Sequence, residues 1–209
     1  MAAAKGARRN NSALMAGTQY LCFGDYMLYK SAHSYRINSC ETIEVFYNIR
    51  TDLDKLKYAA HITKIVNDVT DENQNTYRIL QLLLNTLYVI SETDKNLDLV
   101  LSVFRLRLLC IMGFKPIVNK CSVCGQNDKI RFFSIQDNCV KCESCGRADK
   151  SAITMNITTY DTIRYISSVE AKKIFSFDIP EESIKELDLI TKIYLNEKLE
   201  KEYKLEDLW

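Results

Sequence analysis

The 209-residue sequence predicts an α+β protein in which an N-terminal β region precedes a helical region that carries an inserted cysteine-rich segment. Three observations predict this class. Short aromatic and β-branched runs occupy residues 18–49, apolar residues recur every three or four positions from residue 51, and two C-x-x-C pairs lie within residues 121–145. The predicted domains are 1–50 and 51–209, with a zinc ribbon at 117–150 inserted into the second.

The β region contains four short runs typical of strands, at residues 20–23, 26–29, 35–37 and 43–47. Polar or glycine-containing breaks separate these runs, which predicts a meander of antiparallel strands. Because a short meander is only marginally stable in water, we expect its strands to close on another element.

The helical region begins with three amphipathic stretches, near residues 51–66, 76–91 and 95–112. Short loops join them, which predicts a helical bundle. Thr51 or Asp52 is expected to cap the first helix and Asp94 the third, while Gly113 ends the third helix. Two further helices are expected at 158–168 and from Pro180 to about residue 202.

The cysteines give the strongest signal, because two C-x-x-C-G motifs are separated by seventeen residues. This spacing is typical of a zinc site, in which two tight turns bring four thiolates to one ion at about 2.3 Å. We therefore expect one structural zinc ion held by Cys121, Cys124, Cys142 and Cys145. Cys139 also forms a C-x-x-C pair with Cys142 and is an alternative ligand.

A catalytic role is not expected. Four thiolates leave the ion no open position for a reactive water. The sequence also lacks the P-loop, dinucleotide-binding and nucleophile-elbow motifs. The interpretation is therefore a protein that is not an enzyme and has no small-molecule substrate.

Composition and charge bear on the location of the protein and on the class of its partner. Hydrophobic residues make up 47% of the chain, but no apolar run approaches the roughly 18–20 residues of a membrane span, and no secretory signal is present. The expected location is the cytoplasm, without membrane contact. Residues 1–50 carry six basic and three acidic side chains, and residues 114–157 carry seven and four. Such asymmetry points weakly to a nucleic-acid partner and is equally compatible with chance.

The N-terminal cations Lys5, Arg8 and Arg9 precede a series of strand aromatics. Arginines can contact phosphates while bases stack on aromatic rings, a combination that suits single-stranded nucleic acid. The same residues also fit a solvated basic tail beside an ordinary β core, so both interpretations stay open at this point.

The chain resembles the bacterial recombination mediator RecO family over nearly its whole length, most weakly after about residue 158. The later part of the family's N-terminal OB-fold is matched by Lys5-Gly-Ala-Arg8, Gly17-Thr-Gln-Tyr20 and Tyr26-Met-Leu-Tyr29. The first helix is matched by Asp52-Leu-Asp-Lys-Leu-Lys-Tyr-Ala59. The most specific match is Phe104-Arg-Leu-Arg-Leu-Leu-Cys-Ile-Met-Gly113-Phe-Lys-Pro116, which runs into Cys121-x-x-Cys124.

This resemblance implies a partial OB-fold, because the family begins with strands before its Lys-Gly-Ala-Arg motif and only residues 1–4 precede it here. It implies DNA contact at Lys5, Arg8 and Arg9, and it identifies the four-cysteine set with the family's zinc element. Where the family commonly has Gly-Gly before the second cysteine pair, this chain has Asn138-Cys139, which keeps the alternative ligand open.

The function implied by the resemblance is that of a DNA repair and recombination mediator. Family members bind single- and double-stranded DNA, anneal complementary strands and act with RecR to load the recombinase RecA, which places the protein at the nucleoid during repair. Some relatives hold the acidic, apolar tail of single-stranded DNA-binding protein, for which Arg105 and Arg107 are the nearest cationic candidates. The alternative is a protein-interaction adaptor whose DNA binding is weak or lost.

Overall fold

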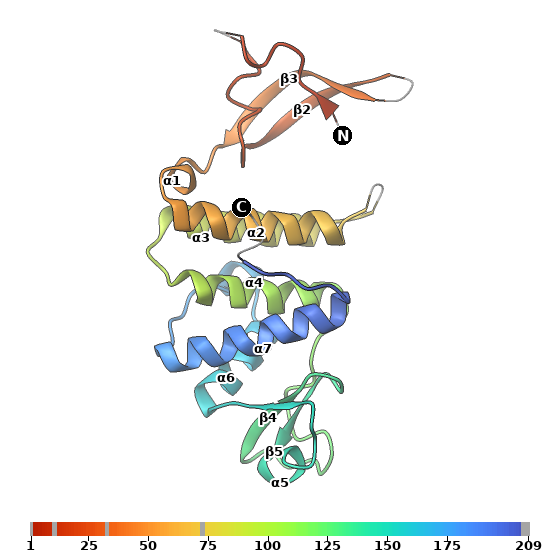
Figure 1. Cartoon of the computed structure of the whole chain (residues 1–209), viewed down its shortest axis with the longest axis vertical. Coiled ribbons are helices and arrows are strands. Elements are labelled where there is room, and N and C mark those ends of the chain that lie inside the picture. Colours follow the sequence, from red (N-terminus) through yellow and green to blue (C-terminus); the bar gives the residue numbers. More distant parts are fainter. Residues whose placement is uncertain (1, 10–11, 32–33, 72–73, 206–209) are drawn as a thin grey trace. The chain divides into compact units, whose positions relative to one another are not determined.

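The computed structural model describes residues 2–9, 12–31, 34–71 and 74–205 and shows the predicted α+β class (Figure 1). The chain forms two compact units, unit 1 at residues 1–51 and unit 2 at residues 52–209. Unit 1 contains a sheet, and unit 2 contains a helical bundle with a small second sheet. The fold class expected from the sequence is therefore confirmed.

Unit 1 is built on the antiparallel pair β2 (Phe23–Lys30) and β3 (Tyr35–Glu44). The short strand β1 (Ala2–Ala3) pairs in parallel with the other edge of β3, giving the order β1-β3-β2. Between β1 and β2 the chain forms a series of turns. The Tyr26 hydroxyl donates a hydrogen bond of 2.6 Å to the carbonyl of Gly17, which ties these turns to the sheet.

The strands of unit 1 differ from the four predicted runs. The predicted strand at 20–23 is wrong, because these residues form turns and only Phe23 joins the sheet. The runs at 26–29 and 35–37 are parts of longer strands, while the run at 43–47 leaves the sheet after Glu44 and leads into α1 (Tyr47–Arg50). The Glu44 carboxylate accepts hydrogen bonds from the next two backbone N–H groups, at 2.8 and 3.2 Å. These bonds turn the chain before the apolar residues that follow can extend the strand.

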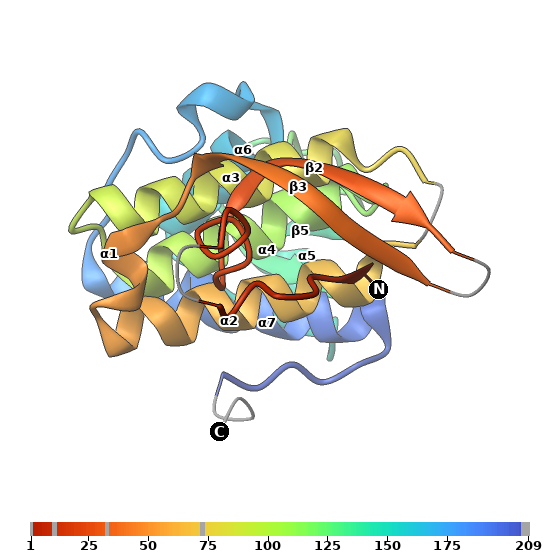
Figure 2. The same cartoon turned by 90° about the horizontal axis from the view of Figure 1, so that it is seen from above.

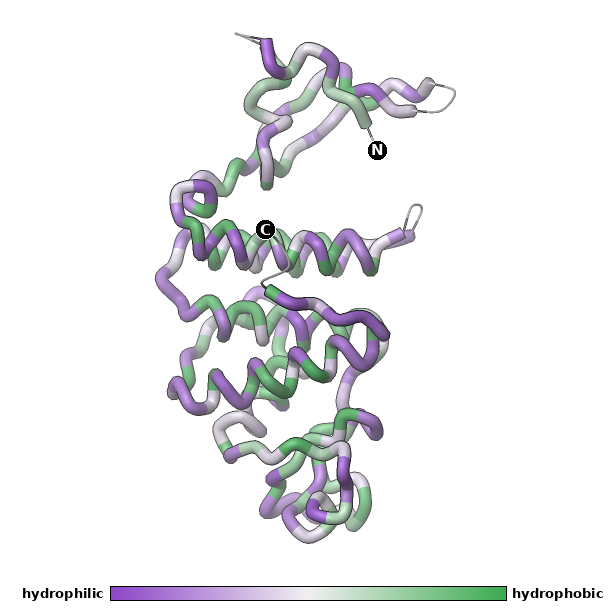
Figure 3. Tube along the Cα trace, in the orientation of Figure 1, coloured by the Kyte–Doolittle hydropathy of each residue, from purple (hydrophilic) through white to green (hydrophobic). Residues whose placement is uncertain are grey.

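Unit 2 is organised around α4 (Leu97–Ile111), which packs against α2 (Leu53–Val69), α3 (Tyr77–Glu92), α6 (Ile157–Ser168) and α7 (Glu181–Leu199). Helices α2 and α3 run side by side (Figure 1 and Figure 2). Apolar residues recur along these helices (Figure 3) and form the core. Among the described residues, no helix is both long enough and apolar enough to cross a membrane.

Side-chain caps fix where three of these helices begin. The side chain of Asp52 accepts the backbone N–H groups of the first turn of α2, and Asn96 and Asn156 do the same for α4 and α6. The predicted cap Asp94 of α4 is wrong. Asn96, two residues later, accepts the N–H groups of Asp98 and Leu99 at 2.9 and 3.1 Å.

The ribbon is a small antiparallel sheet inserted between α4 and α6. Its order is β5-β4-β6, formed by β5 (Cys139–Cys142), β4 (Ile130–Ser134) and β6 (Ala152–Thr154), and α5 (Glu143–Gly146) follows β5. Within it the buried ammonium of Lys141 pairs with Asp137 and Asp149. This ion network joins β5 to the turns on both sides of it.

The observed cap of α4 can be tested directly. Asn96→Ala is expected to lower the free energy of unfolding by about 1 kcal/mol, because two N–H groups lose their acceptor. Asp94→Ala is the matched control and should cost less than about 0.5 kcal/mol, since the exposed Asp94 does not cap the helix. Urea denaturation measures both values, and equal losses would contradict the assignment.

Candidate metal centre and cationic cavity

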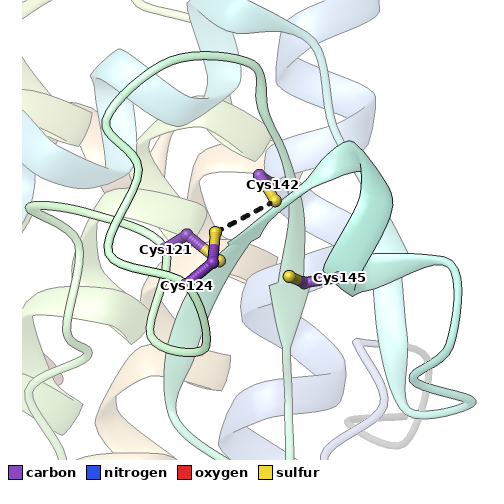
Figure 4. Close-up of side chains that lie close together, drawn as sticks. All are labelled: Cys121, Cys124, Cys142 and Cys145. Atoms are coloured by element: carbon purple, nitrogen blue, oxygen red, sulfur yellow. Dashed lines mark hydrogen bonds between the residues drawn. The ribbon is translucent and has the colours of Figure 1, made fainter.

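Four cysteine side chains from two parts of the ribbon converge on one point (Figure 4). Cys121 and Cys124 lie on the turn that precedes β4, whereas Cys142 ends β5 and Cys145 lies on α5. Pairing of β4 with β5 brings residue 142 next to residue 130, so the second pair folds back onto the first.

The distances within this four-cysteine cluster fit a tetrahedral metal ion. All four Sγ atoms lie within 4.8 Å of one another, and those of Cys124 and Cys142 are 3.7 Å apart. Four sulfurs at about 2.3 Å from a tetrahedral ion are about 3.8 Å from each other. The cluster can therefore hold a metal ion of the size and ligand preference of zinc.

The pKa values of the cysteine thiols indicate that the cluster favours a bound cation. Burial opposes ionisation of Cys121, but nearby backbone N–H groups outweigh it and lower its pKa to about 6. Hydrogen bonding with Cys142, together with burial, raises the pKa of Cys145 to about 12. Four thiolates this close repel one another, so only some of the thiols ionise easily unless a cation neutralises them.

The two glycines that follow the cysteine pairs are required for different structural reasons, one for its backbone conformation and one for close packing. Gly125 has a φ of +76°, a conformation that lets its N–H donate to the carbonyl of Cys121 at 2.9 Å and closes the turn. Gly146 lies against the ring of Phe132, and a Cβ there would stand 2.3 Å from the ring atoms. The second glycine is thus explained by close packing.

The alternative ligand Cys139 lies outside the four-cysteine cluster. Its buried Sγ is 2.9 Å from the hydroxyl of Ser122, and burial raises the pKa of its thiol. Burial outweighs the hydrogen bond with Ser122, which favours the thiolate, so Cys139 suits a neutral, protonated side chain in the core of the ribbon.

A second feature of unit 2 is a cavity of about 410 Å³. Three cations reach it from α3, α4 and the segment after α4, namely Arg78, Arg107 and Lys115. Its other lining residues include the apolar side chains of Leu82, Ile111 and Ile174 and the amides of Gln81 and Asn85. A cavity with this lining can hold a ligand that is both apolar and negatively charged.

The two arginines singled out in the sequence face different surroundings. Arg107 lines the cavity, and its Nη1 donates to the carbonyl of Ile166 near the end of α6 at 3.1 Å. Arg105 is only 3% exposed and pairs with Asp188 of α7 at 2.6 Å. Residues two apart on a helix point in nearly opposite directions, so only Arg107 is accessible to a ligand in this cavity.

The remaining candidates, Lys5, Arg8 and Arg9, are exposed on the turns between β1 and β2 in unit 1. No carboxylate among the described residues pairs with them. The two arginines lie on the wall of a shallow depression that is also lined by Met15, Thr18 and Gln19.

Sequence reasoning missed Arg78 and Lys115 of the cavity. Arg78 lies outside every motif, Lys115 belongs to the family-like stretch from Phe104 to Pro116 but was not singled out within it, and the cavity joins residues from 78 to 174. The signal that could have found Lys115 was its position two residues after the helix-ending Gly113, where the chain leaves the bundle for the ribbon.

Comparison with known sequences identifies both parts of the chain. Residues 1–46 match the family described as "Recombination protein O N terminal", and residues 50–206 match "Recombination protein O C terminal". The second match alone covers more than half of the chain.

Curated relatives agree with these matches. The DNA repair protein RecO of Acetivibrio thermocellus is 43% identical over 204 residues, which cover 97% of this chain and 81% of the relative. DNA repair protein RecO of Alkaliphilus metalliredigens is 33% identical over 195 residues, covering 93% and 79%. With two family matches and relatives at this identity, the chain belongs to the RecO family of DNA repair proteins.

Proposed function

We propose that the protein is a recombination mediator that binds single- and double-stranded DNA, anneals complementary strands and acts with RecR to load RecA during repair in the bacterial cytoplasm. The observation that carries the proposal is membership of the RecO family in both parts of the chain. Its activity would be one of binding and assembly, without a catalysed reaction.

The charge of unit 1 supports the DNA-binding part. Lys5, Arg8 and Arg9 are exposed, and no described carboxylate neutralises them. Exposed aromatic rings, including those of Tyr29 and Tyr47, lie in the same unit. Cations that contact phosphates and aromatic rings that stack on bases together suit single strands.

The cavity of unit 2 supports a protein partner. An acidic, apolar peptide such as the tail of single-stranded DNA-binding protein could place apolar side chains against Leu82 and Ile174 and its carboxylates near Arg78, Arg107 and Lys115. Of the two arginines considered for this contact, we propose Arg107 as the ligand-binding one. The buried Arg105 instead stabilises the packing of α4 against α7.

The same cavity would also serve the alternative function, a protein-interaction adaptor with weak or lost DNA binding. On that alternative, the protein would bind the tail peptide but would not shift an oligonucleotide even at low salt. A salt-dependent affinity for single-stranded DNA, together with faster annealing of complementary oligonucleotides, would exclude the adaptor.

For the metal centre we propose one structural zinc ion, held by Cys121, Cys124, Cys142 and Cys145. When bound, the ion supplies a closed set of four metal–sulfur bonds that joins the turn before β4 to the end of β5. Site formation of this kind is coupled to folding of the segment that carries the ligands.

The DNA contact is tested by the salt dependence of binding. Arg8→Ala combined with Arg9→Ala is expected to weaken single-strand affinity and to reduce the slope of log affinity against log salt by about 1.4, because each lost phosphate contact removes about 0.7. Fluorescence anisotropy with a labelled oligonucleotide measures the slope. The control changes Lys185 and Lys192 of α7 to alanine and removes the same charge from unit 2. Equal slopes for the two double variants would refute the assignment.

The partner contact is tested with a labelled peptide of the tail sequence. Arg107→Ala is expected to weaken binding about tenfold, since a charge-assisted hydrogen bond is lost from the cavity. Arg164→Ala removes an exposed arginine of α6 and should leave the affinity unchanged. A tenfold loss for both variants would indicate a general effect of charge and contradict the proposed site.

The ligand set is tested by metal content and local stability. Wild-type protein and Cys139→Ser are both expected to retain one zinc ion per chain, because Sγ of Cys139 bonds to Ser122 outside the cluster. Cys142→Ser should lose the ion, and hydrogen exchange of the β4 and β5 amides should accelerate with it. Elemental analysis measures the zinc, and loss of zinc from Cys139→Ser would identify that residue as a ligand instead.

A further inference from the structure

The cation Lys115 lines the cavity of unit 2. It lies on a short link, residues 113–117, that joins α4 to the ribbon. The link begins at Gly113, whose φ of +97° ends the helix, and the N–H of Phe114 then donates to the carbonyl of Leu109 at 2.8 Å. These contacts fix the link at its helical end.

The other end of the link is fixed by the ribbon. The N–H of Ile117 donates to the carbonyl of Asn138 at 2.8 Å, and the N–H of Val140 donates back to the carbonyl of Ile117 at 3.0 Å. Pro116 has a fixed φ and restricts the residue before it to extended conformations. The backbone at Lys115 therefore has few accessible conformations.

One side chain holds the peptide unit of Lys115 from outside the link. The hydroxyl of Tyr194, on α7, donates to the carbonyl of Phe114 at 2.7 Å. That carbonyl belongs to the same peptide plane as the N–H of Lys115, so the bond fixes the orientation of the plane. Because Tyr194 is fully buried, its hydroxyl cannot exchange this bond for one with solvent.

Tyr194 is itself held between the bundle and the ribbon. Its ring meets the ring of Phe133, on β4, edge to face at a centroid distance of 5.1 Å. Burial raises the pKa of Tyr194, so the hydroxyl stays protonated and keeps its role as a donor. The orientation of the link thus depends on a contact among α7, β4 and the end of α4.

We propose that Tyr194 is a positioning residue for ligand binding in the cavity, and that it acts by holding the Phe114–Lys115 peptide plane so that the Lys115 ammonium faces an anionic group of the ligand. This inference rests on the proposed binding of an acidic, apolar peptide in the cavity. Tyr194 itself does not line the cavity, so its effect on binding passes through Lys115.

A double-mutant cycle tests the inference with the same labelled tail peptide. Tyr194→Phe removes the hydroxyl and retains the ring, and is expected to weaken binding about twofold to fivefold, the contribution of one partly exposed ion pair. Lys115→Ala should weaken binding by a similar factor. Because both changes act on one contact, the double variant should bind no more weakly than Lys115→Ala alone.

Tyr160→Phe is the matched control. The hydroxyl of Tyr160 donates to the carbonyl of Val118 at 3.0 Å, a comparable bond to the same chain segment but three residues beyond Lys115. It should leave the peptide affinity unchanged. An undiminished effect of Tyr194→Phe in the Lys115→Ala background would show a general structural role and overturn the inference.

Two further outcomes separate this inference from the function on which it rests. Wild-type protein that does not bind the peptide would overturn the proposed partner site and the inference with it. Wild-type binding that is lost in Arg107→Ala but unchanged in Tyr194→Phe would keep the partner site and overturn the positioning role alone.

Discussion

The burial of α4 on nearly every side is the constraint on which unit 2 depends. Ten of its fifteen residues are buried, and four other helices pack around it. A helix so enclosed cannot accommodate a charge without a partner, and Arg105 therefore pairs with Asp188 of α7. The cavity opens only at the C-terminal part of the helix, where Arg107 is no longer fully covered.

The ribbon contains two clusters of ionisable side chains, one of thiols and one of an ammonium with two carboxylates. At one place four cysteines converge, and a cation bound there would relieve the repulsion between their thiolates. At the other place the carboxylates of Asp137 and Asp149 pair with Lys141, which holds the pKa of both acids below the ordinary range. The carboxylate pairs stabilise the ribbon above about pH 4, the unfolded value for Asp, and lose this effect as the pH falls through the lower folded pKa values.

Much of the fold could be predicted from the sequence, because its signals are local. Helical periodicity and the C-x-x-C spacing gave the helices and the cysteine cluster with ends accurate to a few residues. The failures involve contacts between distant residues or competition between neighbours. The strand at 43–47 is interrupted by the Glu44 side chain, and Asn96 caps α4 although Asp94 offers the same chemistry nearby. The cavity combines residues from 78 to 174, which no local pattern joins.

The link after α4 connects the cavity of the bundle to the ribbon. Lys115 lies between Phe114, which the bundle holds, and Ile117, which pairs with the ribbon. Rearrangement of the ribbon would therefore displace a cation of the cavity, although the cysteine cluster contributes no residue to its lining. The zinc ion that we propose for the cysteine cluster would in this way affect the position of Lys115, because the connecting residues are anchored at both ends and have few other conformations available.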